Sequence, residues 1–310
     1  MRFGWTFCLS CDTIRGRDYS GMRSAPREGA EEEMPESKQK ASHPERTAPV
    51  HQPESSANAA SLSVFAQTEQ YAEAAEALAA RLSIPFAGVA AQGTEVGLLL
   101  SEDGLSLCAN GAFLRADLTA MLPRLTQRNL AAELLVRAAK VKGDRSTMTV
   151  VDATAGFGED SLLLAAAGFH VKLFECNPYI AELLADALRR AAEHPVLSPV
   201  VARMELVKGD SIPALRAMTV PPDVVYLDPM FPGRTKSALV GKKFQLLHLL
   251  EAPCPNEEEL FAAALAAHPR RIVIKRPVKG AYLAGRKPSF SLTGKAVRYD
   301  GIDPASFGGA

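Results

Sequence analysis

TMTVVDATAGFG, residues 147–158, is an apolar run that ends at Asp152 and continues into a turn containing Gly156 and Gly158. A short apolar run rich in valine predicts a buried strand, and glycines in the turn let the backbone approach a ligand closely. GEDSLLLAAAG, residues 158–168, then predicts a helix. Strand, glycine turn and helix in this order predict the first unit of an α/β sheet.

Four further apolar runs follow this unit, and a helical segment over residues 179–192 separates the first two. The runs are HVKLFE (170–175), MELVKGD (204–210), PDVVYLDPMFP (222–232) and RIVIK (271–275). Strands that are continuous in valine, isoleucine and leucine are typical of a parallel sheet covered by helices on both faces. We therefore predict a Rossmann-like α/β domain over residues 126–310, with ligands bound at the carboxyl ends of its strands.

Two different regions precede this domain, and a predicted helix begins it. Residues 61–125 predict a small α+β cap, with a strand at 62–66, a helix at 69–82 and a hairpin across 96–108. Residues 128–141 predict a single helix that Gly143 ends. Residues 1–60 are poor in large apolar side chains from residue 24 onward, so we expect a disordered extension.

The net charge of the 310-residue chain is zero, but the charges are unevenly distributed. Residues 61–233 contain 14 basic and 20 acidic side chains, whereas residues 234–300 contain 13 basic and 5 acidic ones. The neutral total therefore does not exclude a polyanionic partner, because the basic C-terminal region is suited to one.

Composition also excludes several classes of protein. No run of about 18 apolar residues occurs, so we expect no membrane-spanning helix. The five cysteines are scattered and odd in number, which favours a reducing, cytoplasmic location over a disulfide framework. Cys8 and Cys11 form a lone C-x-x-C without a second pair or a histidine partner, so we expect no metal site.

The glycine turn differs from the dinucleotide-binding fingerprint, because Ser161 stands where that motif requires a third glycine. Glu159 and Asp160 follow Gly158 at the predicted helix start, where the helix dipole favours negative charge. Two carboxylates there would repel a pyrophosphate, but they suit the ammonium and hydroxyl groups of an adenosyl amino acid.

Acidic side chains also follow the next two predicted strands. Glu175 can accept hydrogen bonds from ribose hydroxyls, a property that does not by itself separate NAD from S-adenosylmethionine. Asp210 can accept from the exocyclic amine of adenine. Ser211 beside it can equally cap the helix that follows.

YLDPMFP, residues 226–232, is the most specific motif. Proline cannot continue a central strand, so the chain must turn there and present Asp228 and Phe231 at the edge of the sheet. The Asp228 carboxylate and a nearby backbone carbonyl can accept both hydrogens of a planar amine, while Phe231 stacks on the base. We therefore predict Asp228, Pro229 and Phe231 as the catalytic turn of an amine methyltransferase.

Together these motifs resemble the class I S-adenosylmethionine-dependent methyltransferases, and they are similar to the ribosomal RNA small-subunit methyltransferase J family. The shared motifs are DATAGFGED (152–160), LFECNP (173–178), VVYLDPMFP (224–232), KSALV (236–240) and VIKRP (273–277). The resemblance implies S-adenosylmethionine as cofactor and methylation of a guanosine N2 amine in 16S ribosomal RNA. The residues expected to form the cofactor pocket are Asp152, Gly156, Gly158, Glu159, Asp160, Glu175, Cys176, Asp210, Ser211 and Asp228.

The expected partner is ribosomal RNA or the small ribosomal subunit, with no membrane and no metal. The target base must leave its stack to be reached. Basic side chains flanking the catalytic turn and the last strand are expected to contact phosphates. They are Arg234, Lys236, Lys242, Lys243, Lys275 and Arg276.

Three alternatives remain open from the residues. The same turn could serve another amine, such as adenine N6, a protein glutamine or a small molecule. An NAD(P)-binding oxidoreductase is disfavoured by the missing third glycine and by Asp160. A catalytically inactive RNA-binding module that keeps the fold would differ in having no affinity for S-adenosylmethionine.

Overall fold

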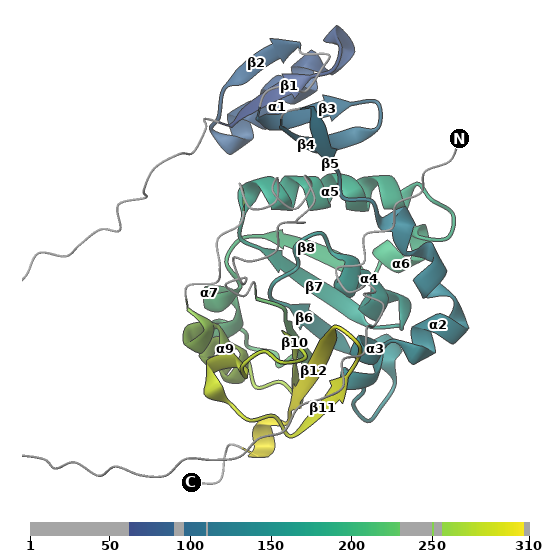
Figure 1. The fold of residues 1–310 in the computed structure, drawn as a ribbon, viewed down its shortest axis with the longest axis vertical. Helices are drawn as coiled ribbons and strands as arrows, with labels where there is room; N and C mark the ends of the chain where they lie inside the picture. Colours follow the sequence, from purple (N-terminus) through teal and green to yellow (C-terminus); the bar gives the residue numbers. More distant parts are fainter. Residues whose placement is uncertain (1–61, 90–95, 110, 230–249, 251–255, 307–310) are drawn as a thin grey trace, which may run out of the picture. The chain divides into compact units, whose positions relative to one another are not determined.

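The computed structural model describes residues 62–89, 96–109, 111–229, 250 and 256–306, which belong to one compact unit. They form a five-stranded sheet and a seven-stranded sheet with helices around them (Figure 1). The disorder predicted for residues 1–60 lies outside the described residues. The larger sheet confirms the predicted α/β class.

The seven strands lie in the order β11-β12-β10-β9-β6-β7-β8. The five strands β10, β9, β6, β7 and β8 are parallel to one another. The strand β12 runs antiparallel to β10, and β11 runs antiparallel to β12. The bounds are β6 Thr149–Asp152, β7 His170–Glu175, β8 Met204–Lys208, β9 Val224–Leu227, β10 Arg271–Pro277, β11 Phe290–Thr293 and β12 Val297–Ile302. The chain order therefore reverses at β6, where a ligand site is expected.

Successive residues of the central strands face opposite sides of this sheet, as strand geometry requires. Val150 packs in one buried cluster with Leu135 and Leu164, and Val151 packs in another with Leu215 and Leu260. The first cluster draws on α3 (Leu134–Ala138) and α4 (Glu159–Ala166), and the second on α7 (Ser211–Arg216) and α9 (Glu257–Ala266). Because helices cover both faces of the sheet, a ligand is expected at the carboxyl ends of the strands.

The smaller sheet has the order β2-β1-β3-β4-β5 and confirms the predicted strand, helix and hairpin. Its elements are β1 Ser63–Ala66, η1 Glu69–Tyr71, α1 Ala72–Leu82, β2 Phe86–Val89, β3 Gly97–Ser101, β4 Gly104–Ala109 and β5 Ala112–Leu114. It is joined to the larger sheet through α5 (Pro178–Ala192): Ile180 and Leu183 pack in its core, and Asp186 accepts a 3.0 Å hydrogen bond from Leu105 N.

The single helix predicted over residues 128–141 is wrong, because the chain forms α2 (Gln127–Ala132) and then α3. Glu133 between them has extended backbone angles, φ −60° and ψ 125°. Its carboxylate accepts hydrogen bonds of 2.7 and 2.8 Å from Arg124. This tertiary ion pair accompanies a break that the apolar spacing does not indicate.

Four strands were not predicted: β2, β5, β11 and β12. In β12 the apolar pattern is interrupted by Arg298 and Asp300, which are buried and joined by hydrogen bonds of 2.9 and 3.0 Å. The other described elements are η2 Leu118–Leu125, η3 Arg145–Thr147, α6 Ser198–Val201, η4 Leu283–Gly285 and η5 Pro304–Ser306.

Candidate active site

Two carboxylates and one lysine meet near the carboxyl ends of β9 and β10 and the start of α4. Lys275 Nζ lies 2.8 Å from Asp160 Oδ2 and 2.9 Å from Asp228 Oδ2, so one ammonium bridges two acids. The Tyr226 hydroxyl donates to the same oxygen of Asp160 at 2.6 Å. The side chains of Lys275, Asp160 and Asp228 are 16%, 17% and 33% exposed, so Asp228 is the most accessible of the three.

Asp152 ends β6 and is 1% exposed. It accepts hydrogen bonds from Ser161 Oγ at 2.6 Å and from Thr154 N at 3.1 Å. Burial raises the pKa of Asp152 to about 7, although these hydrogen bonds act in the opposite direction. Ser161, which replaces the third glycine of the dinucleotide motif, therefore supplies a hydroxyl that holds the acid at the end of this strand.

Glu175 at the end of β7 holds the glycine turn. Its two carboxylate oxygens accept from Gly156 N at 2.9 Å and from Asn177 N at 2.8 Å. Desolvation raises its pKa above the ordinary value. Each carboxylate oxygen has a second lone pair, so Glu175 can hold the turn and still accept from a ribose hydroxyl.

The two predicted glycines adopt left-handed backbone angles, φ +54° at Gly156 and +76° at Gly158. A Cβ at Gly158 would lie 2.7 Å from the Leu184 side chain. Glycine at this position is therefore required by both backbone angle and packing.

Glu159 and Asp160 are the first two residues of α4, and their environments shift their pKa values in opposite directions. Burial, and then the neighbouring charge of Asp160, raise the pKa of Glu159 to about 7. Burial also opposes ionisation of Asp160, but the charge of Lys275 and the hydrogen bonds from Lys275 and Tyr226 outweigh it and lower the pKa of Asp160. Near pH 7 Asp160 is the fixed anion, whereas Glu159 can respond to a cationic ligand.

Cys176, Asp210 and Ser211 lie at the ends of β7 and β8, on the other side of β6 from the lysine bridge. Asp210 is exposed and caps α7 by accepting from Ile212 N at 2.8 Å. The expectation that Ser211 caps this helix is wrong, because Ser211 is its buried first residue. Cys176 is exposed beside Glu175.

Three contributors to this site were not predicted as such: Thr154, Tyr226 and Tyr299. Thr154 Oγ1 accepts from Asp228 N at 2.6 Å, which ties the residue that follows β9 to the glycine turn. Tyr299 of β12 lies opposite Lys275 in the ladder, and burial and nearby carboxylates raise its pKa, so its hydroxyl keeps its proton. Tyr226 and Thr154 stand inside the quoted motifs, but no sequence signal identifies Tyr299.

The predicted residues that follow Asp228 are only partly within the described part of the chain. Phe231, Arg234, Lys236, Lys242 and Lys243 lie outside the described residues, and Pro229 is buried beside Asp228.

Lys275 and Arg276 were predicted to contact phosphates, but both have partners within the protein. Lys275 is held by Asp160 and Asp228. Arg276 is 2% exposed and donates to Ala281 O at 2.8 Å and to Glu257 at 3.2 Å. The structure therefore does not support phosphate contacts by these two side chains.

Within the described residues, no group of three or more histidine, cysteine, aspartate or glutamate side chains is placed to hold a metal ion. No helix in that same part of the chain is both long enough and apolar enough to cross a membrane.

The geometry divides the site into two halves on either side of the glycine turn. Glu175 and Asp210 offer acceptors on the β7 and β8 side, and Asp228 lies on the β9 side. Asp152 and Glu159, between them, are carboxyls that a nearby cation would help to ionise. This arrangement fits S-adenosylmethionine, which has hydroxyls, an amine and two positive charges.

Comparison with known proteins supports the same assignment. A protein-family model described as "Putative SAM-dependent methyltransferase" matches residues 84–302. Ribosomal RNA small subunit methyltransferase J of Thioalkalivibrio sulfidiphilus is 43% identical over 247 residues, which cover 77% of this chain and 96% of that protein. The protein of the same name from Pseudomonas aeruginosa PAO1 is 40% identical over 247 residues, covering 77% and 93%.

A solved structure shows that the fold is shared as well. The crystal structure of a SAM-dependent methyltransferase from Neisseria gonorrhoeae aligns with a TM-score of 0.61 and 32% identity, covering 80% of this chain and 97% of that one. The predicted cofactor and enzyme class are thus confirmed, and the oxidoreductase alternative is excluded. The chain belongs to the ribosomal RNA small subunit methyltransferase J family of S-adenosylmethionine-dependent methyltransferases.

Proposed function

We propose that the protein transfers the methyl group of S-adenosylmethionine to the exocyclic N2 amine of a guanosine in small-subunit ribosomal RNA. The observation that carries this proposal is the position of Asp228, held by Thr154 and Lys275 at the end of β9 yet one-third exposed. The names of the relatives support ribosomal RNA as the substrate class.

When bound, S-adenosylmethionine supplies an electrophilic methyl group on a sulfonium. Asp228 then has one main task, which is to accept an amine N–H and aim the nitrogen lone pair at that methyl. Lys275 occupies Oδ2, and no donor to Oδ1 is found among the described residues, so Oδ1 is the acceptor that we assign to the substrate. With the cofactor bound, a new N–C bond would form as the C–S bond breaks, S-adenosylhomocysteine would leave, and the methylated amine would lose its proton to water.

The remaining predicted residues bind the cofactor or the RNA in this proposal. Glu175 accepts from the ribose hydroxyls, Asp210 from the adenine amine, and Asp152 and Glu159 face the positive charges. Phe231 is the predicted stacking partner of the base. Arg234, Lys236, Lys242 and Lys243 keep their predicted role in binding phosphates.

Binding of the cofactor is expected to release protons from the protein. Asp152 and Glu159 have pKa values of about 7, so at pH 6.5 both are largely protonated, and a bound cation favours their ionised forms. Calorimetry at pH 6.5 in two buffers of different ionisation enthalpy should show release of about one proton per cofactor bound. Affinity should rise between pH 6 and pH 7.5.

Asp152→Asn is the matched control for this experiment. The amide keeps an acceptor for Thr154 N and can donate to Ser161 Oγ, as the protonated acid does, but it cannot ionise. The variant should therefore release fewer protons than the wild type. Proton uptake by the wild type would show that these carboxyls do not face the cofactor charges, and identical release by both proteins would remove Asp152 from that role.

The substrate is tested by mapping modified nucleotides in ribosomal RNA from cells with and without the gene. We expect one N2-methylguanosine of the small-subunit RNA to disappear in the deletion and to return on complementation. An unchanged profile would refute the RNA substrate and would favour methyl transfer to another amine. If the profile is unchanged and the protein also fails to bind S-adenosylmethionine, the two results together would favour an inactive RNA-binding module.

A further inference from the structure

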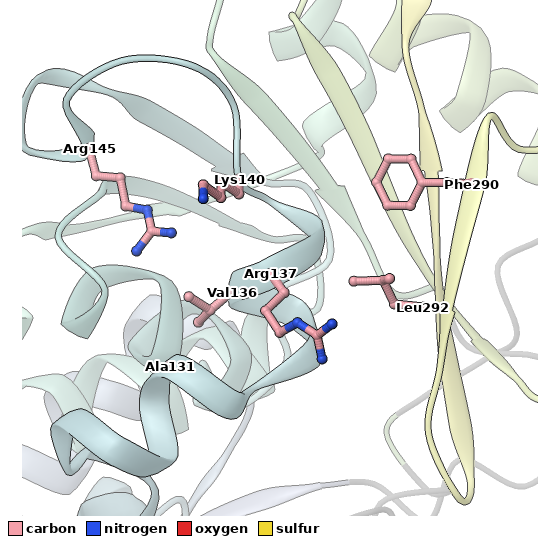
Figure 2. Close-up of a pocket in the computed structure, with 7 residues that line it drawn as sticks. All are labelled: Ala131, Val136, Arg137, Lys140, Arg145, Phe290 and Leu292. Carbon is pink, nitrogen blue, oxygen red and sulfur yellow. The ribbon is translucent and has the colours of Figure 1, made fainter.

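A second feature lies apart from the acid cluster, in a cavity of about 400 Å³ between α3 and β11 (Figure 2). Its lining residues come from α2, α3, η3 and β11 and from the segment after α3. They are Ala131, Val136, Arg137, Lys140, Arg145, Phe290 and Leu292. We call this set the basic pocket.

Three of these residues are cations, and none of the seven is an acid. Within the described part of the chain, Arg137, Lys140 and Arg145 form no ion pair, although many other arginines do. The adjacent acid, Asp144, accepts hydrogen bonds from Ser146 N and Oγ. Three like charges around one cavity repel each other, and an anion in the cavity would remove that cost.

The rest of the pocket is apolar and held in place. Val136 is 3% exposed, and Phe290 and Leu292 pack against the buried cluster of the sheet. The Arg271 guanidinium lies 4.8 Å from the centroid of the Phe290 ring, and Gly301 leaves room for that ring. Arg145 lies over the Phe169 ring, 5.6 Å from its centroid. Apolar surface beside cations without an ion pair among the described residues suits a nucleotide, which combines an aromatic base with a phosphate.

The basic pocket is on the same face of the sheet as the lysine bridge. Leu292, Tyr299 and Lys275 are directly opposite one another across β11, β12 and β10. Two strand spacings of about 4.8 Å separate the first from the last, or about 10 Å. Arg271 and Lys275 also share a face of β10, four residues or about 13 Å apart. This span is within reach of a few nucleotides of one RNA strand.

We propose that the basic pocket binds a nucleotide of the RNA substrate that lies a few positions from the methylated guanosine. The inference rests on the proposed function, since it takes RNA as the substrate. Arg137 and Lys140, both exposed, contact phosphates, and Arg145 with the apolar wall receives the base and sugar. The pocket thereby adds a second anchor and helps to select the RNA segment that enters the site.

The test compares two double variants that remove the same charge. Arg137→Gln with Lys140→Gln changes the pocket, whereas Arg81→Gln with Arg189→Gln removes two arginines that are 58% and 59% exposed elsewhere. Binding of a small-subunit ribosomal RNA fragment is measured by fluorescence anisotropy between 50 and 300 mM salt. We expect the pocket variant to lose about tenfold in affinity, with a salt slope shallower by about 1.4 because two phosphate contacts are lost. The control should change less than twofold.

Several results would overturn the proposed role of the basic pocket in RNA binding. Equal losses in both variants, or an unchanged salt slope in the pocket variant, would overturn the pocket's role. A loss seen only with assembled subunits and not with the RNA fragment would assign the pocket to a ribosomal protein and also overturn it. Methylation by the wild type is assayed alongside, and a wild type that neither binds nor methylates this RNA refutes the proposed function itself. Unchanged cofactor affinity shows that the variants are folded.

Discussion

Asp228→Ala is expected to lower kcat for methyl transfer about 1,000-fold, with a much smaller change in affinity for S-adenosylmethionine. The substitution removes the acceptor that orients the amine, whereas most of the predicted cofactor contacts come from β6, β7 and β8. Single-turnover transfer from labelled cofactor, together with calorimetry of cofactor binding, measures the two effects separately.

Two further variants sharpen this prediction. Asp228→Asn should recover little activity, because Lys275 competes for the only acceptor oxygen and the amide N–H groups then face the substrate amine. Asp210→Ala removes another strand-end carboxylate, and it should raise the KM for the cofactor while changing kcat by only a few fold. An Asp228→Ala protein that keeps kcat within tenfold of the wild type would remove Asp228 from the mechanism.

Lys275→Met is expected to reduce the free energy of unfolding by about 3 kcal/mol at pH 8. The substitution leaves Asp160 and Asp228 close together without the cation that both contact. Burial then raises the pKa of Asp160, and it raises further the pKa of Asp228, which burial already holds above its ordinary value in the wild type. This loss of about 3 kcal/mol is at the low end of what breaking a buried ion pair costs, because the three side chains are 16–33% exposed.

The pH dependence of this loss has a definite sign. In the wild type the pKa of Asp160 is below its ordinary value of 3.8, so its contribution is present above that pH and is lost as the pH falls through the lower value. In Lys275→Met the pKa of Asp160 is raised as well as that of Asp228, so both carboxyls then cost stability as the pH rises. Urea unfolding at pH 5 and pH 8 should therefore show the larger deficit at pH 8.

Lys275→Met combined with Asp160→Asn is the compensating variant. It leaves one buried carboxylate instead of two, so it should recover a substantial part of the stability lost at pH 8. A single variant as stable as the wild type at both pH values would contradict the bridging role of Lys275.

Local sequence was sufficient for the glycine turn and for the end of β9. Pro229 cannot continue a central strand, and β9 ends at Leu227, directly before Asp228. Gly158 occupies a left-handed position against Leu184, where other residues would be strained. The strand β12 was not predicted, because a strand stabilised by a buried Arg298–Asp300 pair has no continuous apolar pattern.

The sequence by itself determined the α/β class, the family, the cofactor and the acidic residues that end its strands, because these depend on short motifs with strong local constraints. Only the tertiary structure showed that Lys275 bridges Asp160 and Asp228, that Tyr299 lies beside them, and that Arg137 and Lys140 face the same cavity as Phe290. Residues 115 positions apart, such as Asp160 and Lys275, meet only when the sheet forms. Their pairing depends on strand order and register, which no local pattern of charges specifies.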